Sequence, residues 1–163
     1  MRIRLERPED HAAIRAVTAA AFGGSSYGHN GEADIVEALR ADGALTVSLA
    51  AEAEGEIVGH VAFSPVAITT AEGDWYGLGP ISVAPDHQGR GVGAALTREG
   101  LQALEALKAS GCVVLGDPGY YGRFGFKSDP ALRYGPDPSP YLQRLVMRGP
   151  APCGEVRYHP SFG

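Results

Sequence analysis

The chain has 163 residues, the size of one domain of ordinary length. Hydrophobic residues make up 44% and charged residues 20%, which is the composition of a folded globular protein rather than a disordered one. The net charge is −5, from 19 acidic and 14 basic residues, and the basic residues are scattered. A protein that binds nucleic acid by neutralising its phosphates is therefore not expected.

Targeting signals and metal-binding patterns are not found in the sequence. No run is apolar for the roughly 18 residues that a membrane span needs, and Arg2 to Glu6 is charged where a signal peptide would be apolar. We therefore expect a cytoplasmic protein with no membrane partner. Cys112 and Cys153 lie in no CxxC or Cys/His cluster, which predicts free thiols and no zinc. Four histidines show no metal-ligand spacing with one another: His11, His29, His87 and His159.

One strand and two helices are predicted near the N-terminus. Arg2–Leu5 alternates basic and apolar side chains, as a strand with one solvated face does. A helix is expected from Pro8 to Gly23–Gly24, since proline suits a first helical position and apolar residues then recur at helical spacing. After the polar segment Ser25–Gly31, a second helix is expected from about Glu32 to Gly43.

The pattern then changes to that of strands. Thr46–Ala53 and Glu56–Ile68 are strand-like runs, and the two residues between them are typical of a hairpin turn. Trp75–Val83 is a further strand. Because it contains Gly79–Pro80, it predicts a bulge or the close approach of another group.

A long helix and a buried strand follow. Val92–Ala109 has the strongest helical pattern, and Gly111 is expected to end it in a left-handed conformation. Cys112–Leu115 is continuously apolar, as in a strand covered on both faces. Two more strands are expected at Tyr141–Met147 and Glu155–Tyr158. The buried stripe of the helix is expected to be Leu96, Gly100, Ala103, Leu104 and Leu107.

The glycine run Gln88–Gly93 lies between the strand and the long helix. Glycines let backbone N–H groups approach a ligand closely, and the helix N-terminus adds a partial positive charge. The run therefore predicts a phosphate site without a metal, with a turn that binds nothing as the alternative.

Two known phosphate motifs can be compared with this run. The Walker motif fails, because no Lys-Ser or Lys-Thr follows the glycines. The dinucleotide fingerprint G-x-G-x-x-A is formally met by Gly89–Ala94, with Asp117 further on. That fold needs repeated βαβ units, whereas this chain has room for one parallel crossover, from Trp75–Val83 through the helix to Cys112–Leu115.

The run from Ile81 to Gly93, with Leu96 after it, resembles the acetyl-CoA signature of the GNAT acetyltransferase superfamily. Its core is Q/R-x-x-G-x-G/A after a strand that ends in V-x-P. The order of elements also matches over about residues 1–148, and residues 149–163 would be a proline-rich extension with a short strand, packed on the same domain. The resemblance implies an α/β fold with a mixed, mostly antiparallel sheet, flanked by helices and parallel only at two splayed strands.

The resemblance also implies how acetyl-CoA is held. Backbone amides of the glycine run would bind the pyrophosphate. The end of Trp75–Val83 would splay from Cys112–Leu115 and receive the pantetheine arm between the two strands. The CoA-binding residues implied are Ile81, Ser82, Val83, Gln88, Gly89, Arg90, Gly91, Val92, Gly93, Tyr121 and Phe124.

A candidate general acid lies in Tyr121–Phe126, which matches the family's Y-x-x-x-G-F. The tyrosine hydroxyl would lie near the CoA sulfur. With an ordinary pKa of about 10, it is protonated at neutral pH and can donate to a thiolate. The family's N-x-x-A is absent before it, and Asp117 is expected to cap a short helix instead. Tyr120 is therefore the alternative acid, and a core role is the alternative for Phe124.

The general base is not evident, because Trp75–Val83 contains no acidic residue. Glu32 and His60 are the candidates for the base. The alternative for Glu32 is a solvated helix carboxylate, and the alternative for His60 is a hydrogen-bonded strand histidine.

We predict acetyl transfer from acetyl-CoA to a primary amine, of a small molecule or a protein, by direct attack in a ternary complex. The rivals are a CoA-binding regulatory module without turnover and, less favoured, a nicotinamide-binding protein. The acceptor and a homodimer stay open, with Gly23–Gly31 and Ser128–Gly163 expected on the acceptor side.

Overall fold

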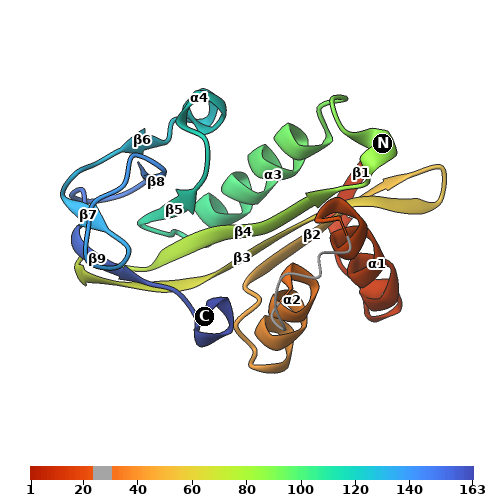
Figure 1. Ribbon diagram of the computed structural model, residues 1–163, viewed down its shortest axis with the longest axis horizontal. Coiled ribbons are helices and arrows are strands. Elements are labelled where there is room, and N and C mark those ends of the chain that lie inside the picture. Colours follow the sequence, from red (N-terminus) through yellow and green to blue (C-terminus); the bar gives the residue numbers. More distant parts are fainter. Residues whose placement is uncertain (24–30) are drawn as a thin grey trace.

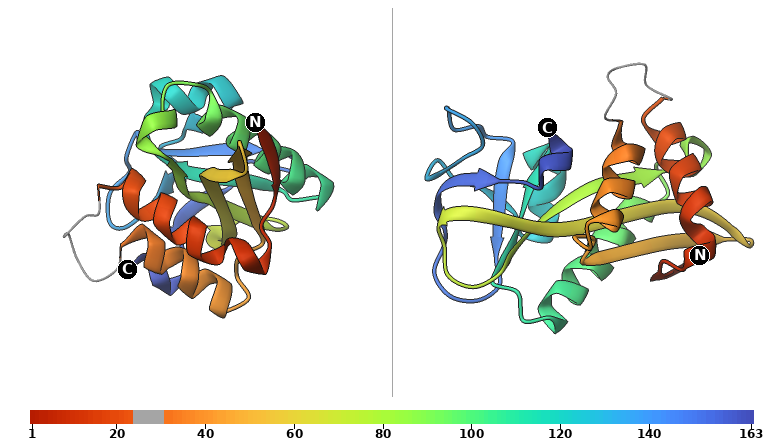
Figure 2. Two further views of the ribbon diagram at one scale, coloured as in Figure 1. Left: turned by 90° about the vertical axis from the view of Figure 1, so that its right-hand side faces the viewer. Right: turned by 90° about the horizontal axis from the view of Figure 1, so that it is seen from below.

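The computed structural model describes residues 1–23 and 31–163 of the chain. Helices α1 (His11–Ala21) and α2 (Glu32–Ala41) cover one face of a sheet, and α3 (Val92–Ala106) covers the other (Figures 1 and 2). The predicted segment Ser25–Gly31, except for its last residue, lies outside the described residues. Among the helices in the described ranges, none is long and apolar enough to cross a membrane.

The sheet contains the strands that the sequence pattern predicts. Its strands lie in the order β1, β2, β3, β4, β5, β8, β6. Neighbours are antiparallel except β4 and β5, which are parallel and are joined through α3. The predicted α/β fold with one parallel crossover in a mixed sheet is thus confirmed. The strand bounds are β1 Arg2–Leu5, β2 Val47–Ala53, β3 Glu56–Thr70, β4 Trp75–Val83, β5 Gly111–Leu115, β6 Lys127–Ser128 and β8 Leu142–Val146.

The C-terminal segment returns to the middle of the molecule. Strand β9 (Cys153–Arg157) pairs antiparallel with the far end of the long β3. It also pairs in parallel with the two-residue β7 (Leu132–Arg133), which the sequence pattern does not predict. A 3₁₀ turn at Pro160–Phe162 then packs on α2, so the C-terminus lies beside that helix (Figure 1). Late aromatic residues are thereby brought next to the start of α2.

Helix α3 packs on the sheet through a stripe that differs from the predicted one, its buried residues being Val92, Leu96, Thr97, Gly100, Leu101 and Leu104. Leu96 and Leu104 are fully buried, whereas Leu107 is 53% exposed. The helix ends at Ala106, and Lys108 takes the left-handed conformation with φ 61°. The predicted burial of Leu107 is therefore wrong, because the last helical turn runs past the edge of the core.

Gly111 does not end the helix, and that prediction is also wrong. It is the first residue of β5 and is buried. A Cβ at this position would lie 2.3 Å from the carbonyl oxygen of Leu145 and 2.4 Å from the ring of Trp75. Packing between neighbouring strands, rather than a left-handed turn, therefore requires glycine here.

Strands β4 and β5 separate part of the way along. Their last pair is Gly77 with Val113, and within the described residues β4 runs on to Val83 without β5 beside it. The predicted bulge at Gly79–Pro80 is confirmed, because the register of β4 against β3 shifts there by one residue. Backbone groups of β4 beyond Gly77 are thus left free of β5, as the predicted splay requires.

Candidate functional site

The glycine loop joins the end of β4 to the start of α3. Gly89 and Gly91 have φ of +76° and +82°, and Gly91 immediately precedes the helix. A Cβ built on either residue would point into open space. The left-handed backbone conformation, rather than crowding, therefore favours glycine at both positions. The loop presents bare backbone at the N-terminus of a four-turn helix, as an anion site does.

A cavity of about 350 Å³ lies over this loop. Arg123 lines it, with its guanidinium 4.4 Å from the ring centroid of Tyr120 and its Nε donating to the Tyr120 carbonyl oxygen at 2.9 Å. The Nδ1 atom of His87 is buried and has no partner among the described residues. A cationic side chain and a helix N-terminus thus border a space suited to phosphate groups.

Six of the predicted CoA-binding residues line this cavity: Val83, Gln88, Gly89, Gly91, Val92 and Gly93. Arg90 is exposed and lies outside the lining, and Ile81 packs against the core. The Ser82 hydroxyl is buried and lies 3.2 Å from that of Thr18 in α1. Phe124 lies outside the cavity, with the Arg98 guanidinium 5.1 Å from its ring centroid.

Four lining residues were not predicted as ligand-binding: His87, Ala94, Tyr120 and Arg123. The sequence does hold a signal for two of them, because Tyr120 and Arg123 are three residues apart around a short helical turn and can share one side of it. That turn contains α4 (Pro118–Tyr121), whose first turn is capped by the predicted residue, Asp117.

Tyr121 is held against the core rather than in the loop cavity. A Cβ on Gly116 would lie 2.4 Å from its ring, and the Phe126 ring meets it edge-on at 5.9 Å. Burial raises the pKa of Tyr121 to about 12, with smaller contributions from Tyr120 and Cys112. The hydroxyl therefore stays protonated at neutral pH and can act as a hydrogen-bond and proton donor.

A second cavity, of about 270 Å³, lies where β4 and β5 separate. Leu78, Gly79 and Pro80 of β4 and Leu115 of β5 form one side of it. The cavity is also lined by Glu32, which is the first residue of α2 and one of the two candidates for the general base. The remaining lining residues are mostly aromatic: Phe22, Ile35, Tyr134, Tyr158 and Phe162. The predicted acceptor-side residues of 24–30 lie outside the described residues.

His60, the other base candidate, is buried beneath α1 and α2 and is 1% exposed. Its Nε2 lies 2.7 Å from the Ser48 hydroxyl, which donates to Glu6 at 2.5 Å. Arg40 donates to both Glu6 oxygens, at 2.8 and 3.0 Å. Within the described residues, His60 lines neither of the two cavities.

The pKa values in this network follow from burial and hydrogen bonding. Burial lowers the pKa of His60, and the Glu6 carboxylate opposes that effect only in part. For Glu6, burial alone would raise the pKa, but the nearby His60 ring and the hydrogen bonds from Arg40 and Ser48 outweigh it and hold the pKa well below its usual range. The network therefore contains a neutral histidine and an ionised carboxylate, and it ties the residue after β1 to β2, β3 and α2.

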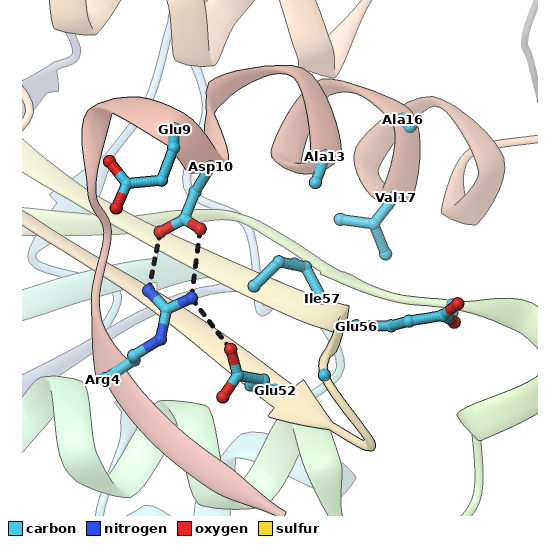
Figure 3. Close-up of a pocket in the computed structure, with 11 residues that line it drawn as sticks. Arg4, Glu9, Asp10, Ala13, Ala16, Val17, Glu52, Glu56 and Ile57 are labelled. Atoms are coloured by element: carbon cyan, nitrogen blue, oxygen red, sulfur yellow. Dashed lines mark hydrogen bonds and ion pairs between the residues drawn. The ribbon is translucent and has the colours of Figure 1, made fainter.

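A third cavity, of about 580 Å³, lies between α1 and the β2–β3 hairpin (Figure 3). The Arg4 guanidinium donates to both oxygens of Asp10, at 2.6 and 3.0 Å, and to Glu52 at 3.1 Å. The hydrogen bonds from Arg4 lower the pKa of Asp10. None of the predicted site residues lines this cavity, and its ion pairs join β1 to the turn before α1 and to β2.

Comparison with known proteins agrees with this geometry. A family model described as an acetyltransferase (GNAT) domain matches residues 45–128. The uncharacterised N-acetyltransferase YhbS of Escherichia coli is 39% identical over 128 residues, which are 78% of this chain and 74% of YhbS.

Solved structures extend the similarity to almost the whole chain. A GNAT family acetyltransferase from Brucella melitensis, in complex with acetyl-CoA, is 51% identical with a TM-score of 0.86, over 99% of this chain and 97% of that one. The YhbS structure from Escherichia coli, in complex with CoA, is 34% identical with a TM-score of 0.86, over 99% and 91%. The glycine loop predicted this relationship from its residues, and the chain belongs to the GNAT family of N-acetyltransferases.

Proposed function

We propose that this protein transfers an acetyl group from acetyl-CoA to a primary amine, which attacks directly within a ternary complex. One observation carries the proposal: the same strand, β4, ends at the glycine-loop cavity and lines the Glu32 cavity at its bulge. A molecule held along β4 can therefore place a phosphate end in the first cavity and a reactive end beside the second. Similar proteins crystallised with acetyl-CoA and with CoA support this assignment.

The loop cavity suits the pyrophosphate of CoA. The N–H groups of residues 88–93 and the Arg123 guanidinium supply donors and positive charge. Ile81 and Ser82 direct their side chains into the protein, so we assign their role to the backbone of β4, which can pair with the amides of pantetheine. Phe124 then supports the site by packing.

Tyr121 and Glu32 are the proposed acid and base. Tyr121 keeps its proton at neutral pH and donates it to the sulfur that leaves as CoA is released. Glu32 lines the cavity at the strand opening and accepts the proton that the attacking amine loses. The geometry favours Glu32 over His60, because His60 is buried and already bonded to Ser48.

CoA or acetyl-CoA should raise the melting temperature of the protein, whereas NAD and NADP should not. A ligand present at about 100 times its Kd stabilises the folded state by about 2.7 kcal/mol. For a chain of this size, that free energy raises the Tm by about 5–10 °C. Differential scanning fluorimetry measures the shift, and stabilisation by NAD without any by CoA would overturn the proposal.

Glu32→Gln should lower kcat by about 10²-fold or more, because it removes the proposed proton acceptor and keeps the size of the side chain. Glu37→Gln is the matched control, since Glu37 lies on the same helix, is exposed and pairs with Arg15. Its turnover should stay within about twofold of the original protein. Release of CoA measured against amine concentration separates kcat from KM.

Two further outcomes of that assay decide between the alternatives. If Glu32→Gln and His60→Ala each leave turnover within about twofold, neither residue is the base and the cavity acts by positioning alone. If no amine is acetylated although acetyl-CoA binds tightly, the protein is a CoA-binding regulatory module.

A further inference from the structure

We infer that the acceptor is a small monoamine on an apolar, ring-sized body without a carboxylate, of the arylalkylamine class, and that it binds in the cavity between Glu32 and the C-terminal aromatic residues. This inference rests on the proposed acetyl transfer and names the substrate class for the same site. Three features of the cavity carry it: the rings in its wall, the charge of its lining and an unsatisfied hydroxyl.

Three rings form one wall of the cavity. The Tyr158 ring meets the Tyr134 ring edge-on, with the ring centroids 5.2 Å apart. It meets the Phe162 ring at a tilt, with the centroids 5.3 Å apart. Tyr134 itself is 41% exposed, and two other large apolar residues of the lining are also exposed, Phe22 by 38% and Leu115 by 44%. Exposed apolar side chains gathered around one hollow are typical of a surface that binds an apolar ligand. Flat rings add edge-to-face contacts with a ligand ring.

Glu32 is the one charged side chain in the described part of the lining. A protonated amine is attracted to this carboxylate, and aromatic faces also favour a cation. A free amino acid would bring its own carboxylate beside Glu32, with no Lys, Arg or His among the described lining residues to pair with it. A diamine would bring a second ammonium group with no second carboxylate. The charge of the described lining thus favours one amine and no acid group.

The Tyr158 hydroxyl is buried and has no hydrogen-bond partner among the described residues. Its ring lies over Gly77, where a Cβ would approach Tyr158 Cε1 to 2.7 Å. Gly77 is the last residue of β4 that pairs with β5, so the Tyr158 ring belongs to the wall at the strand opening, with its hydroxyl buried behind it. Burial raises the pKa of Tyr158, which keeps it a donor. Buried donors are rarely left unsatisfied, and a bound ligand would supply the missing acceptor.

The size of the cavity agrees with a small acceptor. Its volume of about 270 Å³ lies just below the range of roughly 300–1,000 Å³ that holds drug-sized ligands. A single ring with a short aminoalkyl chain needs no more space than this. A peptide acceptor would have to leave most of its residues outside the cavity.

Matched amines test the inference directly on the unmodified protein with acetyl-CoA. Phenethylamine and phenylalanine differ by a carboxylate, phenethylamine and ethylamine by the ring, and 1,4-diaminobutane adds a second ammonium group. We expect kcat/KM for phenethylamine to exceed that of each of the other three amines by at least about tenfold. The reason is that its ammonium group and its ring would each make a partly desolvated contact, with Glu32 and with the aromatic wall. A higher kcat/KM for phenylalanine, for the diamine or for an N-terminal peptide amine would overturn the inference while leaving acetyl transfer intact. If no amine reacts while acetyl-CoA still raises the Tm, the proposed function fails and this inference falls with it.

Phe162→Ala tests the aromatic wall. Phe162 lies next to the C-terminus in the lining and outside both core clusters, so the variant should fold. We expect the KM for phenethylamine to rise about tenfold, while the KM for acetyl-CoA and the kcat/KM for ethylamine stay within about twofold. Tyr141→Ala is the control, since Tyr141 is 59% exposed and outside the lining. An unchanged KM for phenethylamine in Phe162→Ala would show that the wall does not hold the acceptor.

Discussion

Gly91→Val is expected to abolish the stabilisation of the protein by CoA. Gly91 has φ +82° directly before α3, a conformation that a β-branched residue adopts only with strain. The valine therefore either distorts the loop or projects its methyl groups over the N–H groups that the pyrophosphate would bind. We expect no CoA-induced rise in Tm at concentrations that shift the original protein by several degrees.

Gly43→Val is the matched control for this substitution. Gly43 also has a positive φ, of +68°, and open space where a Cβ would be, but it lies between α2 and β2, away from the loop. Both variants should lose a similar amount of stability, about 1–2 kcal/mol from the left-handed conformation. Only Gly91→Val should lose the response to CoA. A folded Gly91→Val protein that binds CoA normally would show that the loop is not the site.

The strands were the most predictable part of the fold. Trp75–Val83 was predicted with the bounds that the structure gives, because its apolar run ends at clear turn residues on both sides. The bulge followed from Gly79–Pro80, since proline cannot donate in a ladder and glycine tolerates the shift in register. Local backbone chemistry determines these features, so the sequence reveals them.

Features that depend on distant contacts were predicted less well. Gly111 looks like a helix stop when only its neighbours in sequence are considered, but Trp75 and Leu145 on the flanking strands require it to lack a side chain. The pairing of β7 with β9 depends on the path of a proline-rich segment that has no periodic pattern. In both cases the determining contact is made by residues more than 20 positions away.

In the candidate site, too, a local motif could be predicted from the sequence, whereas features that depend on distant contacts could not. The glycine loop could be found because its signal is a local motif that precedes a helix. Ser128–Gly163 was expected on the acceptor side, but its rings Tyr134, Tyr158 and Phe162 could not be singled out, because their place beside Glu32 depends on the pairing of β9 with β3. His60 was a reasonable candidate by residue type, but its burial and its bond to Ser48 depend on how α1 and α2 cover the sheet.

Tyr120 and Tyr121 occupy different surroundings, which makes the identity of the acid testable. Tyr120 lines the glycine-loop cavity, with its hydroxyl 3.4 Å from where a Cβ on Gly93 would lie and Arg123 stacked on its ring. Tyr121 packs against the core near Cys112, which lies on β5, the strand next to β4. The first arrangement suits the binding of CoA phosphates, and in the second we propose donation to the reacting sulfur.

Tyr121→Phe should therefore lower kcat by about 10²–10⁴-fold while the Tm shift with CoA is retained, because the ring and its packing remain and only the proton donor is lost. Tyr120→Phe is the internal control: kcat should change little, and any loss should be in the affinity for CoA. Steady-state CoA release, together with the CoA-induced Tm shift, separates the two effects. If Tyr120→Phe proves to be the damaging change and Tyr121→Phe is mild, the acid is the hydroxyl at the glycine loop, and the reacting sulfur lies closer to α3 than the strand opening implies.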